Sequence, residues 1–148
     1  MHPKKSKNNS PRIKIIQKIY NSLINPEEEI EYPKSQYKKF IKDIVQGTIE
    51  RRELIEEKIN THLKGDLDLK RTDKILKIII YAAIYEILFK HNISINVIIS
   101  EYLKASEFFL EKIQIKYLNA ILDKISKKIR NENNWITPYK KLFEDFDF

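Results

Sequence analysis

Residues 72–91 of this chain, TDKILKIIIYAAIYEILFKH, decide its fold. The segment is too long for a strand, because strands usually end after about six residues, so we predict a helix. Apolar side chains would occupy almost every side of this helix, which must therefore be buried on most sides. Lys77 and Glu86 leave an uncharged run that is shorter than the ~20 apolar residues of a membrane span. We expect the central helix of one helical domain, with Thr72 able to cap its first turn.

The composition supports an all-α fold. Two glycines and five prolines among 148 residues leave little material for tight turns, which argues for long helices and against a sandwich or a barrel. Hydrophobic residues make up 42% of the chain, which excludes wholesale disorder. The absence of cysteine excludes disulfides and thiolate metal sites, and it is compatible with a cytoplasmic location.

A first amphipathic helix is expected over residues 11–23. Its apolar residues recur at spacings of three and four, which is typical of a helix with one buried face. Three basic residues, Arg12, Lys14 and Lys18, lie largely off this stripe. The stripe consists of Ile13, Ile16, Ile19, Tyr20 and Leu23.

Further helices are predicted on both sides of the central one. One begins near Ser35 and breaks near residues 50–53, so that two helices follow each other there. Two more cover residues 95–109 and the residues from Glu111 onward. Gly47 lies inside a helical pattern, where glycine costs about 1 kcal/mol relative to alanine. A close crossing with another helix would explain this glycine.

Positive charge is concentrated at the start of the chain. The net charge is +7, and no acidic residue occurs before Glu27. An unpaired basic segment that runs into a helix is typical of phosphate binding, so we predict that this segment contacts nucleic acid. A merely solvated tail is the alternative. The basic residues concerned are Lys4, Lys5, Lys7, Arg12, Lys14 and Lys18.

No catalytic or metal-binding constellation is evident. The three histidines, His2, His62 and His91, are scattered without the spacing of metal ligands, and the chain has no glycine-rich phosphate loop. Asp66 and Asp68 form an acidic pair without a histidine or lysine placed to make a site. We therefore expect neither enzymatic activity nor a metal or cofactor.

The chain divides into three parts by composition. We expect residues 1–11 to form a basic flexible arm, residues 12–130 a helical domain, for which the family resemblance described below implies RNA binding, and residues 131–148 an acidic aromatic tail. The tail carries Trp135 together with several phenylalanines, and exposed aromatic surface of this kind is costly. We expect the tail to dock on its own domain.

Four motifs, in order, resemble the NusB family of transcription antitermination factors. Residues 17–20, QKIY, are similar to the family's "VQALY", and residues 83–88, AIYEIL, to the end of its central helix, "YELL". Residues 92–101, NISINVIISE, resemble "DIPxxVxINEA", and residues 116–124, KYLNAILDK, resemble "KFVNGVLDK". The family-like order and spacing of the motifs make chance similarity a poor explanation.

This resemblance implies a fold and a function. The fold would be all-α and NusB-like, with six to seven helices in two small bundles packed as one compact domain. The function would be non-enzymatic: binding the box A element of nascent ribosomal RNA leaders together with NusE, a ribosomal small-subunit protein. The pair would help to load an antitermination complex on RNA polymerase. Alternatives are a protein-interaction module without direct RNA contact and the RNA-binding domain of a ribosomal RNA methyltransferase.

The resemblance also assigns roles to residues. Tyr117 lies where the family has a base-stacking phenylalanine, and Lys116 matches the preceding basic residue; ordinary core packing of Tyr117 is the alternative. Asn119, in the same motif, either contacts RNA or holds a neighbouring loop. Glu86 and Glu101 are the predicted contacts with the partner protein, although Glu86 could instead satisfy an internal lysine or arginine.

Arg12 matches a basic position of the family's arginine-rich stretch, but the arm of this chain contains lysine where the family favours arginine. Fewer bidentate contacts with phosphate are therefore expected. Ser94 replaces the usual proline and can cap a helix equally well. Ala120 replaces a glycine, which puts the local geometry of this motif in doubt.

Overall fold

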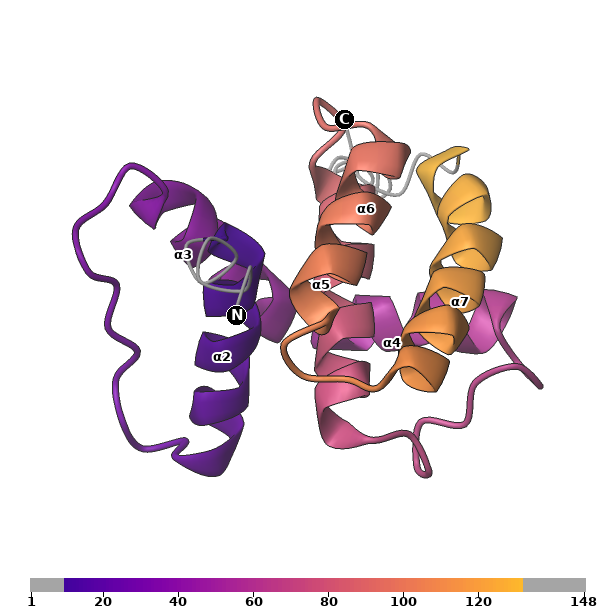
Figure 1. The fold of residues 1–148 in the computed structure, drawn as a ribbon, viewed down its shortest axis with the longest axis horizontal. Coiled ribbons are helices and arrows are strands. Elements are labelled where there is room, and N and C mark those ends of the chain that lie inside the picture. Colours follow the sequence, from indigo (N-terminus) through magenta and orange to yellow (C-terminus); the bar gives the residue numbers. More distant parts are fainter. Residues whose placement is uncertain (1–9, 132–148) are drawn as a thin grey trace, which may run out of the picture.

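The computed structural model describes residues 10–131, and the secondary structure of this part consists of six α-helices without a strand (Figure 1). This confirms the all-α prediction. The basic arm was predicted over residues 1–11 and the acidic tail over residues 131–148, and all of these except residues 10, 11 and 131 lie outside the described residues. The helices are α2 (Pro11–Ile24), α3 (Lys38–Glu50), α4 (Arg52–His62), α5 (Lys74–Phe89), α6 (Ile95–Ser106) and α7 (Lys112–Asn131).

Helix α5 lies at the centre of the molecule, as predicted. It packs against each of the five other helices, and every residue from Ile78 to Leu88 is buried. The N-cap is Asp73, whose carboxylate accepts hydrogen bonds from the backbone N–H groups of Ile75 and Leu76. The prediction that Thr72 caps this helix is wrong, because its hydroxyl donates to the backbone carbonyl of Asp68 instead.

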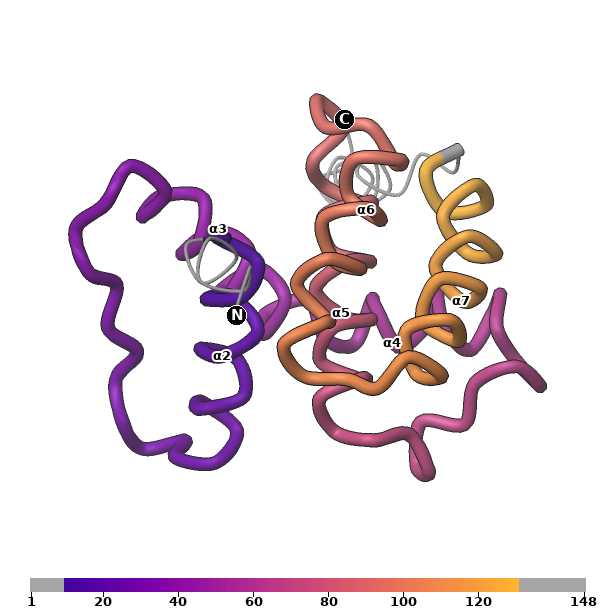
Figure 2. The backbone as a smooth tube through the Cα atoms, in the orientation of Figure 1, coloured from indigo at the N-terminus to yellow at the C-terminus, as the bar shows by residue number. Residues whose placement is uncertain are grey.

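The other helices form two groups on either side of α5. Helices α2 and α3 pack against each other at one end of the long axis, and α4, α6 and α7 lie toward the other end (Figure 1). The α2–α3 loop follows the outer edge of the first group, and the α4–α5 loop follows the opposite edge of the second (Figure 2). This arrangement agrees with the expected two small bundles.

The predicted close crossing at Gly47 lies between α3 and α5. A Cβ atom at Gly47 would lie 2.1 Å from Cζ of Tyr85, so only glycine leaves room for the tyrosine ring. The hydroxyl of Tyr85 donates a hydrogen bond of 3.1 Å to the carboxylate of Asp43, and Lys90 forms an ion pair with the same carboxylate. The glycine thus allows a polar contact between the first group and the central helix. The break predicted near residues 50–53 is confirmed at Arg51.

Two details differ from the predicted helix faces. Leu23 is 52% exposed although it belongs to the apolar stripe of α2, and Val97, which helical spacing predicts on the inner face of α6, is 49% exposed. Each lies near an end of its helix, so the remaining stripe residues of both helices can pack inward without it. Within the described part of the chain, no helix is both long and apolar enough to cross a membrane.

Candidate nucleic-acid interface

Tyr117 occupies the exposed start of α7. Its side chain is 37% exposed, and its hydroxyl donates a hydrogen bond of 2.6 Å to the backbone carbonyl of Asp66. Partial burial and, to a lesser extent, the charge of Asp66 raise the pKa of Tyr117, so the hydroxyl stays protonated and able to donate. The ring is therefore neither free nor part of the core: one edge is fixed and part of its surface is open to a ligand.

The α4–α5 loop faces Tyr117 across a broad cleft of about 1140 Å³. Lys64 and Lys70 of this loop line the cleft with exposed side chains, and Arg71 lines it while lying 3.8 Å from Asp68. Sequence patterns do not single out these residues, because the contact between Tyr117 and the loop spans 51 positions of the chain. The feature of the sequence that could have indicated this cleft is the occurrence of three basic residues in one short loop.

An ion pair holds the loop against α7. Lys124 lies two turns after Tyr117 and contacts the carboxylate of Asp66, while the carbonyl of the same aspartate accepts the Tyr117 hydroxyl. Both partners of the ion pair are partly exposed, so its net stabilisation is on the order of 0–1 kcal/mol. Its geometric effect is larger, because one loop residue receives two contacts from one face of α7.

Arg12 and Glu86 form a buried ion pair between α2 and α5. The guanidinium donates from Nη2 to Oε1 of Glu86 at 2.6 Å and from Nε to Oε2 at 3.1 Å, which is bidentate geometry. Its carbon Cζ lies 4.9 Å from the ring centroid of Phe40 and 5.7 Å from that of Tyr102. Burial alone would lower the pKa of Arg12, but hydrogen bonding and the charge of Glu86 outweigh burial and raise it.

The ion pair buries both side chains, contrary to the predicted binding roles of Arg12 and Glu86. Glu86 is 0% exposed and Arg12 is 8% exposed, so neither side chain is accessible to RNA or to a partner protein in this structure. The expectation that Arg12 lies off the buried stripe is wrong. Its partner is 74 positions away in the chain, which is why helical periodicity could not reveal the burial.

Glu101 of α6 remains accessible. Its side chain is 32% exposed, and it lies 3.9 Å from Nη1 of Arg12 and 3.4 Å from Nζ of Lys104. It therefore borders the buried pair while presenting part of its carboxylate to solvent.

Lys14 and Lys18 lie at the other end of the molecule from Tyr117. They line a groove between α2 and the α2–α3 loop, and Nζ of Lys18 donates to the backbone carbonyl of Glu31 at 2.6 Å. Lys116, by contrast, is exposed on α7 next to Tyr117. Lys14 and Lys18 are thus separate from Lys116 and Tyr117, and Lys4, Lys5 and Lys7 lie outside the described residues.

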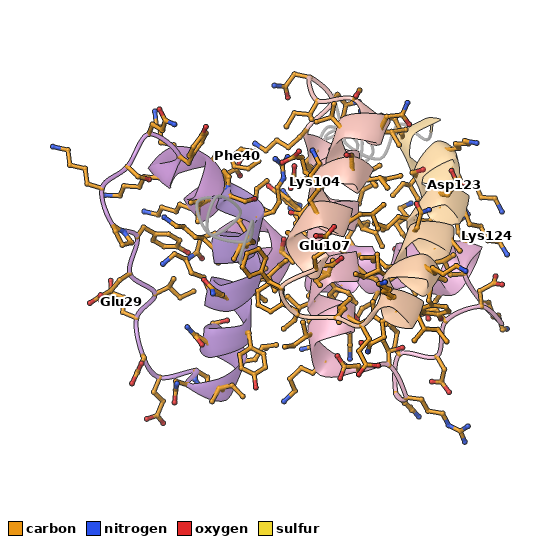
Figure 3. All side chains as sticks on the ribbon, in the orientation of Figure 1. Glu29, Phe40, Lys104, Glu107, Asp123 and Lys124 are labelled. Carbon is orange, nitrogen blue, oxygen red and sulfur yellow. The ribbon has the colours of Figure 1, made fainter. Side chains whose placement is uncertain are left out.

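Asn119 is not brought together with Tyr117. Two residues along a helix turn the side chain by about 200°, so Asn119 faces away from the Tyr117 cleft. It lines a shallow groove between α6 and α7 with Lys104, Glu107 and Asp123, which Figure 3 labels on the two helices. Across residues 10–131, no three histidine, aspartate or glutamate side chains lie close enough together to hold a metal ion.

Comparison with known proteins places this geometry in a family. The model of the NusB family matches residues 5–127, which is most of the chain. The "Transcription antitermination protein NusB" of Mesorhizobium japonicum is 34% identical over 89 residues, which cover 60% of this chain and 57% of that protein. The protein of the same name from Novosphingobium aromaticivorans is 29% identical over 103 residues, covering 70% of this chain and 69% of that protein. The chain thus spans little more than half the length of the first of these relatives.

A solved structure of T. maritima NusB has a similar fold. The TM-score is 0.68 at 21% sequence identity, and the match covers 80% of this chain and 90% of that one. At this identity the likeness concerns the fold alone. The names of the relatives describe a role in transcription and no enzymatic reaction. Together, the family model over residues 5–127, the curated relatives and the shared all-α fold establish that this chain belongs to the NusB family.

Proposed function

We propose that this protein is a non-enzymatic transcription antitermination factor that binds box A of nascent ribosomal RNA leaders together with NusE. The pair would join an antitermination complex on RNA polymerase and support transcription of ribosomal RNA in the cytoplasm. Family membership supports the general role, and the Tyr117 cleft supports the contact with RNA.

One observation carries the proposal: Tyr117 is an exposed aromatic ring with a fixed edge. Its hydroxyl is bonded to the Asp66 carbonyl, and its surroundings carry the exposed lysines Lys64, Lys70 and Lys116. A base can stack on such a ring for about 1–3 kcal/mol while the lysines neutralise phosphates. Stacking by itself tolerates any base, so we propose that neighbouring polar groups select the box A base that reaches the ring, and that scrambled RNA uses the ring much less.

The surface for NusE is proposed around α6 and the accessible part of α5. Glu101 supports this placement because its carboxylate is partly exposed on α6. Glu86 is not part of the proposed contact, since it is fully buried against Arg12. Its role is to hold α2 against α5, and thus to fix the helix that follows the basic arm.

The test compares box A RNA with a scrambled RNA, each with and without NusE. Replacing Tyr117 with alanine removes the ring, so we expect box A binding to weaken by about 5- to 150-fold, the equivalent of 1–3 kcal/mol. Binding to the scrambled RNA should weaken much less. Fluorescence anisotropy titrations with labelled RNA measure both affinities.

Tyr37→Ala is the matched control, because Tyr37 is a similarly exposed tyrosine, 43% exposed, at the start of α3. It should leave box A binding unchanged. Equal losses on both RNAs after Tyr117→Ala would contradict the stacking role. Weak binding to every RNA alongside tight binding to NusE would instead support a protein-interaction module without direct RNA contact.

A further inference from the structure

A groove of about 280 Å³ opens between α2 and the α2–α3 loop, at the end of the molecule opposite the α4–α5 loop (Figure 1). Two lysines of α2, Lys14 and Lys18, line one side, and Lys34 of the loop and Lys38 of α3 line the other. Tyr32 lies among them, and no acidic residue lines the groove. We refer to these five residues as the lysine groove.

Among the residues that the structure describes, no carboxylate forms an ion pair with a lysine of the lysine groove. The side chains of Lys14, Lys34 and Lys38 form no ion pair or hydrogen bond with any described residue. Lys18 donates to a backbone carbonyl, which is a neutral acceptor. Four cations around one small groove repel each other, and a polyanion would relieve this repulsion.

Tyr32 gives the groove a fixed aromatic element. Its hydroxyl accepts a hydrogen bond of 2.9 Å from Nε2 of Gln46, and its side chain is half-buried. The ammonium groups of Lys18 and Lys42 lie 5.4 Å and 5.9 Å from the ring centroid. An aromatic ring held among cations is typical of surfaces that bind single-stranded nucleic acid.

The size of the groove and its borders restrict the ligand. A volume of 280 Å³ is just below the range of enclosed ligand pockets, about 300–1000 Å³, so it suits one phosphate and sugar of a strand passing over it. Glu28, Glu29 and Glu31 line an adjoining surface of the same loop, which shares Lys18 with the groove. They would repel a strand there and direct it past Lys34 and Lys38.

We propose that the lysine groove binds the backbone of single-stranded RNA, as a second site for the strand that the Tyr117 cleft holds. The inference rests on the proposed RNA binding but concerns residues that the box A contact does not use, Tyr32, Lys34 and Lys38. RNA that extends beyond box A would therefore bind more tightly than box A alone, and the additional affinity would depend on salt rather than on base sequence.

The experiment measures the affinity of the full chain for box A RNA and for the same RNA extended at both ends by unstructured sequence, over a series of salt concentrations. We expect the extension to tighten binding severalfold. In the double variant Lys34→Gln with Lys38→Gln, this gain should disappear, and the slope of log K against log salt should fall by about 1.4, which is 0.7 for each of two phosphates. The affinity for box A alone should stay unchanged.

Lys127→Gln with Lys128→Gln is the control, because both lysines are exposed near the far end of α7 and the change in net charge is the same. It should retain the gain from the extension. An extension that adds no affinity to the unaltered protein, or equal losses in both double variants, would overturn the inference.

Two further outcomes separate this inference from the proposed function. Extended RNA that binds through Lys34 and Lys38, with no preference for box A over a scrambled core, would refute the box A function and leave the lysine groove supported. A polyglutamate peptide of matched charge should bind more weakly than the extended RNA. Equal or tighter peptide binding that depends on Lys34 and Lys38 would assign the groove to an acidic protein segment and overturn the inference.

Discussion

The two ends of the molecule hold their basic residues in different ways. At the Tyr117 cleft, Lys124 is paired with Asp66, and the same aspartate fixes the tyrosine hydroxyl. At the lysine groove, the side chains of Lys34 and Lys38 have no ion pair or hydrogen bond with the described residues. A lysine in an ion pair has a fixed position, but its charge is neutralised by the partner. An unpaired lysine keeps its full charge, but its side chain has no fixed position. The fixed ring of Tyr117 suits the recognition of a base, with Lys64 and Lys70 left to neutralise phosphates beside it, whereas the lysine groove suits the neutralisation of phosphates alone.

Both ends are fixed relative to each other through α5. Arg12 at the start of α2 reaches Glu86 of α5, and Gly47 of α3 admits the ring of Tyr85 from the same helix. The relative position of the two ends therefore depends on these two contacts, and substitutions at them should have the largest effects on the free energy of unfolding.

Glu86→Gln should have the largest effect of the three variants below. It leaves the buried guanidinium of Arg12 with only the partly exposed carboxylate of Glu101, 3.9 Å away, as a counter-charge. Breaking a buried ion pair in this way costs about 3–5 kcal/mol of unfolding free energy. Urea denaturation followed by circular dichroism measures the loss. Replacing both partners, Arg12→Met with Glu86→Leu, should recover much of the stability. If Glu86→Gln lowers the free energy of unfolding by less than about 1 kcal/mol, the Arg12–Glu86 ion pair does not hold the two ends together.

Gly47→Ala should come second. The added methyl group would lie 2.1 Å from Cζ of Tyr85, so the ring must move and its hydrogen bond to Asp43 is lost. Overpacking of this kind costs about 1–3 kcal/mol, against a gain of about 1 kcal/mol in helix propensity. Thermal and urea unfolding give the net effect. Combining the change with Tyr85→Leu should reduce the penalty, and an unchanged penalty would place the strain elsewhere.

Tyr117→Phe should have the smallest effect of the three. It tests the Tyr117 cleft alone and leaves the lysine groove unaltered. The ring remains for stacking, but the hydrogen bond of 2.6 Å to the Asp66 carbonyl is lost. We expect a loss of about 0.5–1.5 kcal/mol in box A affinity, less than for Tyr117→Ala. The gain from extended RNA at the lysine groove should not change. If phenylalanine weakens binding as much as alanine, the hydroxyl acts on the RNA rather than by fixing the ring.

The sequence predicted the helices well because local patterns encode them. The central helix was expected over residues 72–91 and lies at Lys74–Phe89, and the break near Arg51 was also correct. The N-cap was assigned to Thr72 rather than Asp73, since both residue types cap helices and only the contact of Thr72 with Asp68 separates them.

The candidate site was less predictable because it depends on contacts between distant residues. Tyr117 was identified from a family motif, but its bond to Asp66 joins positions 51 apart. The burial of Arg12 likewise depends on a carboxylate 74 positions away. Lys34 and Lys38 were not singled out, because only the packing of α2 against α3 brings them together with Lys14 and Lys18.

The enclosure of α5 has a consequence for how the molecule comes apart. Both groups of helices pack against this one helix, and its side chains from Ile78 to Leu88 are buried on all sides. Neither group can detach without exposing a face of α5 to water. Opening one group alone therefore costs free energy, because it exposes apolar surface of the helix on which the other group packs. The residues described here should therefore unfold as a single cooperative unit, with α5 the last segment whose amide protons exchange with solvent.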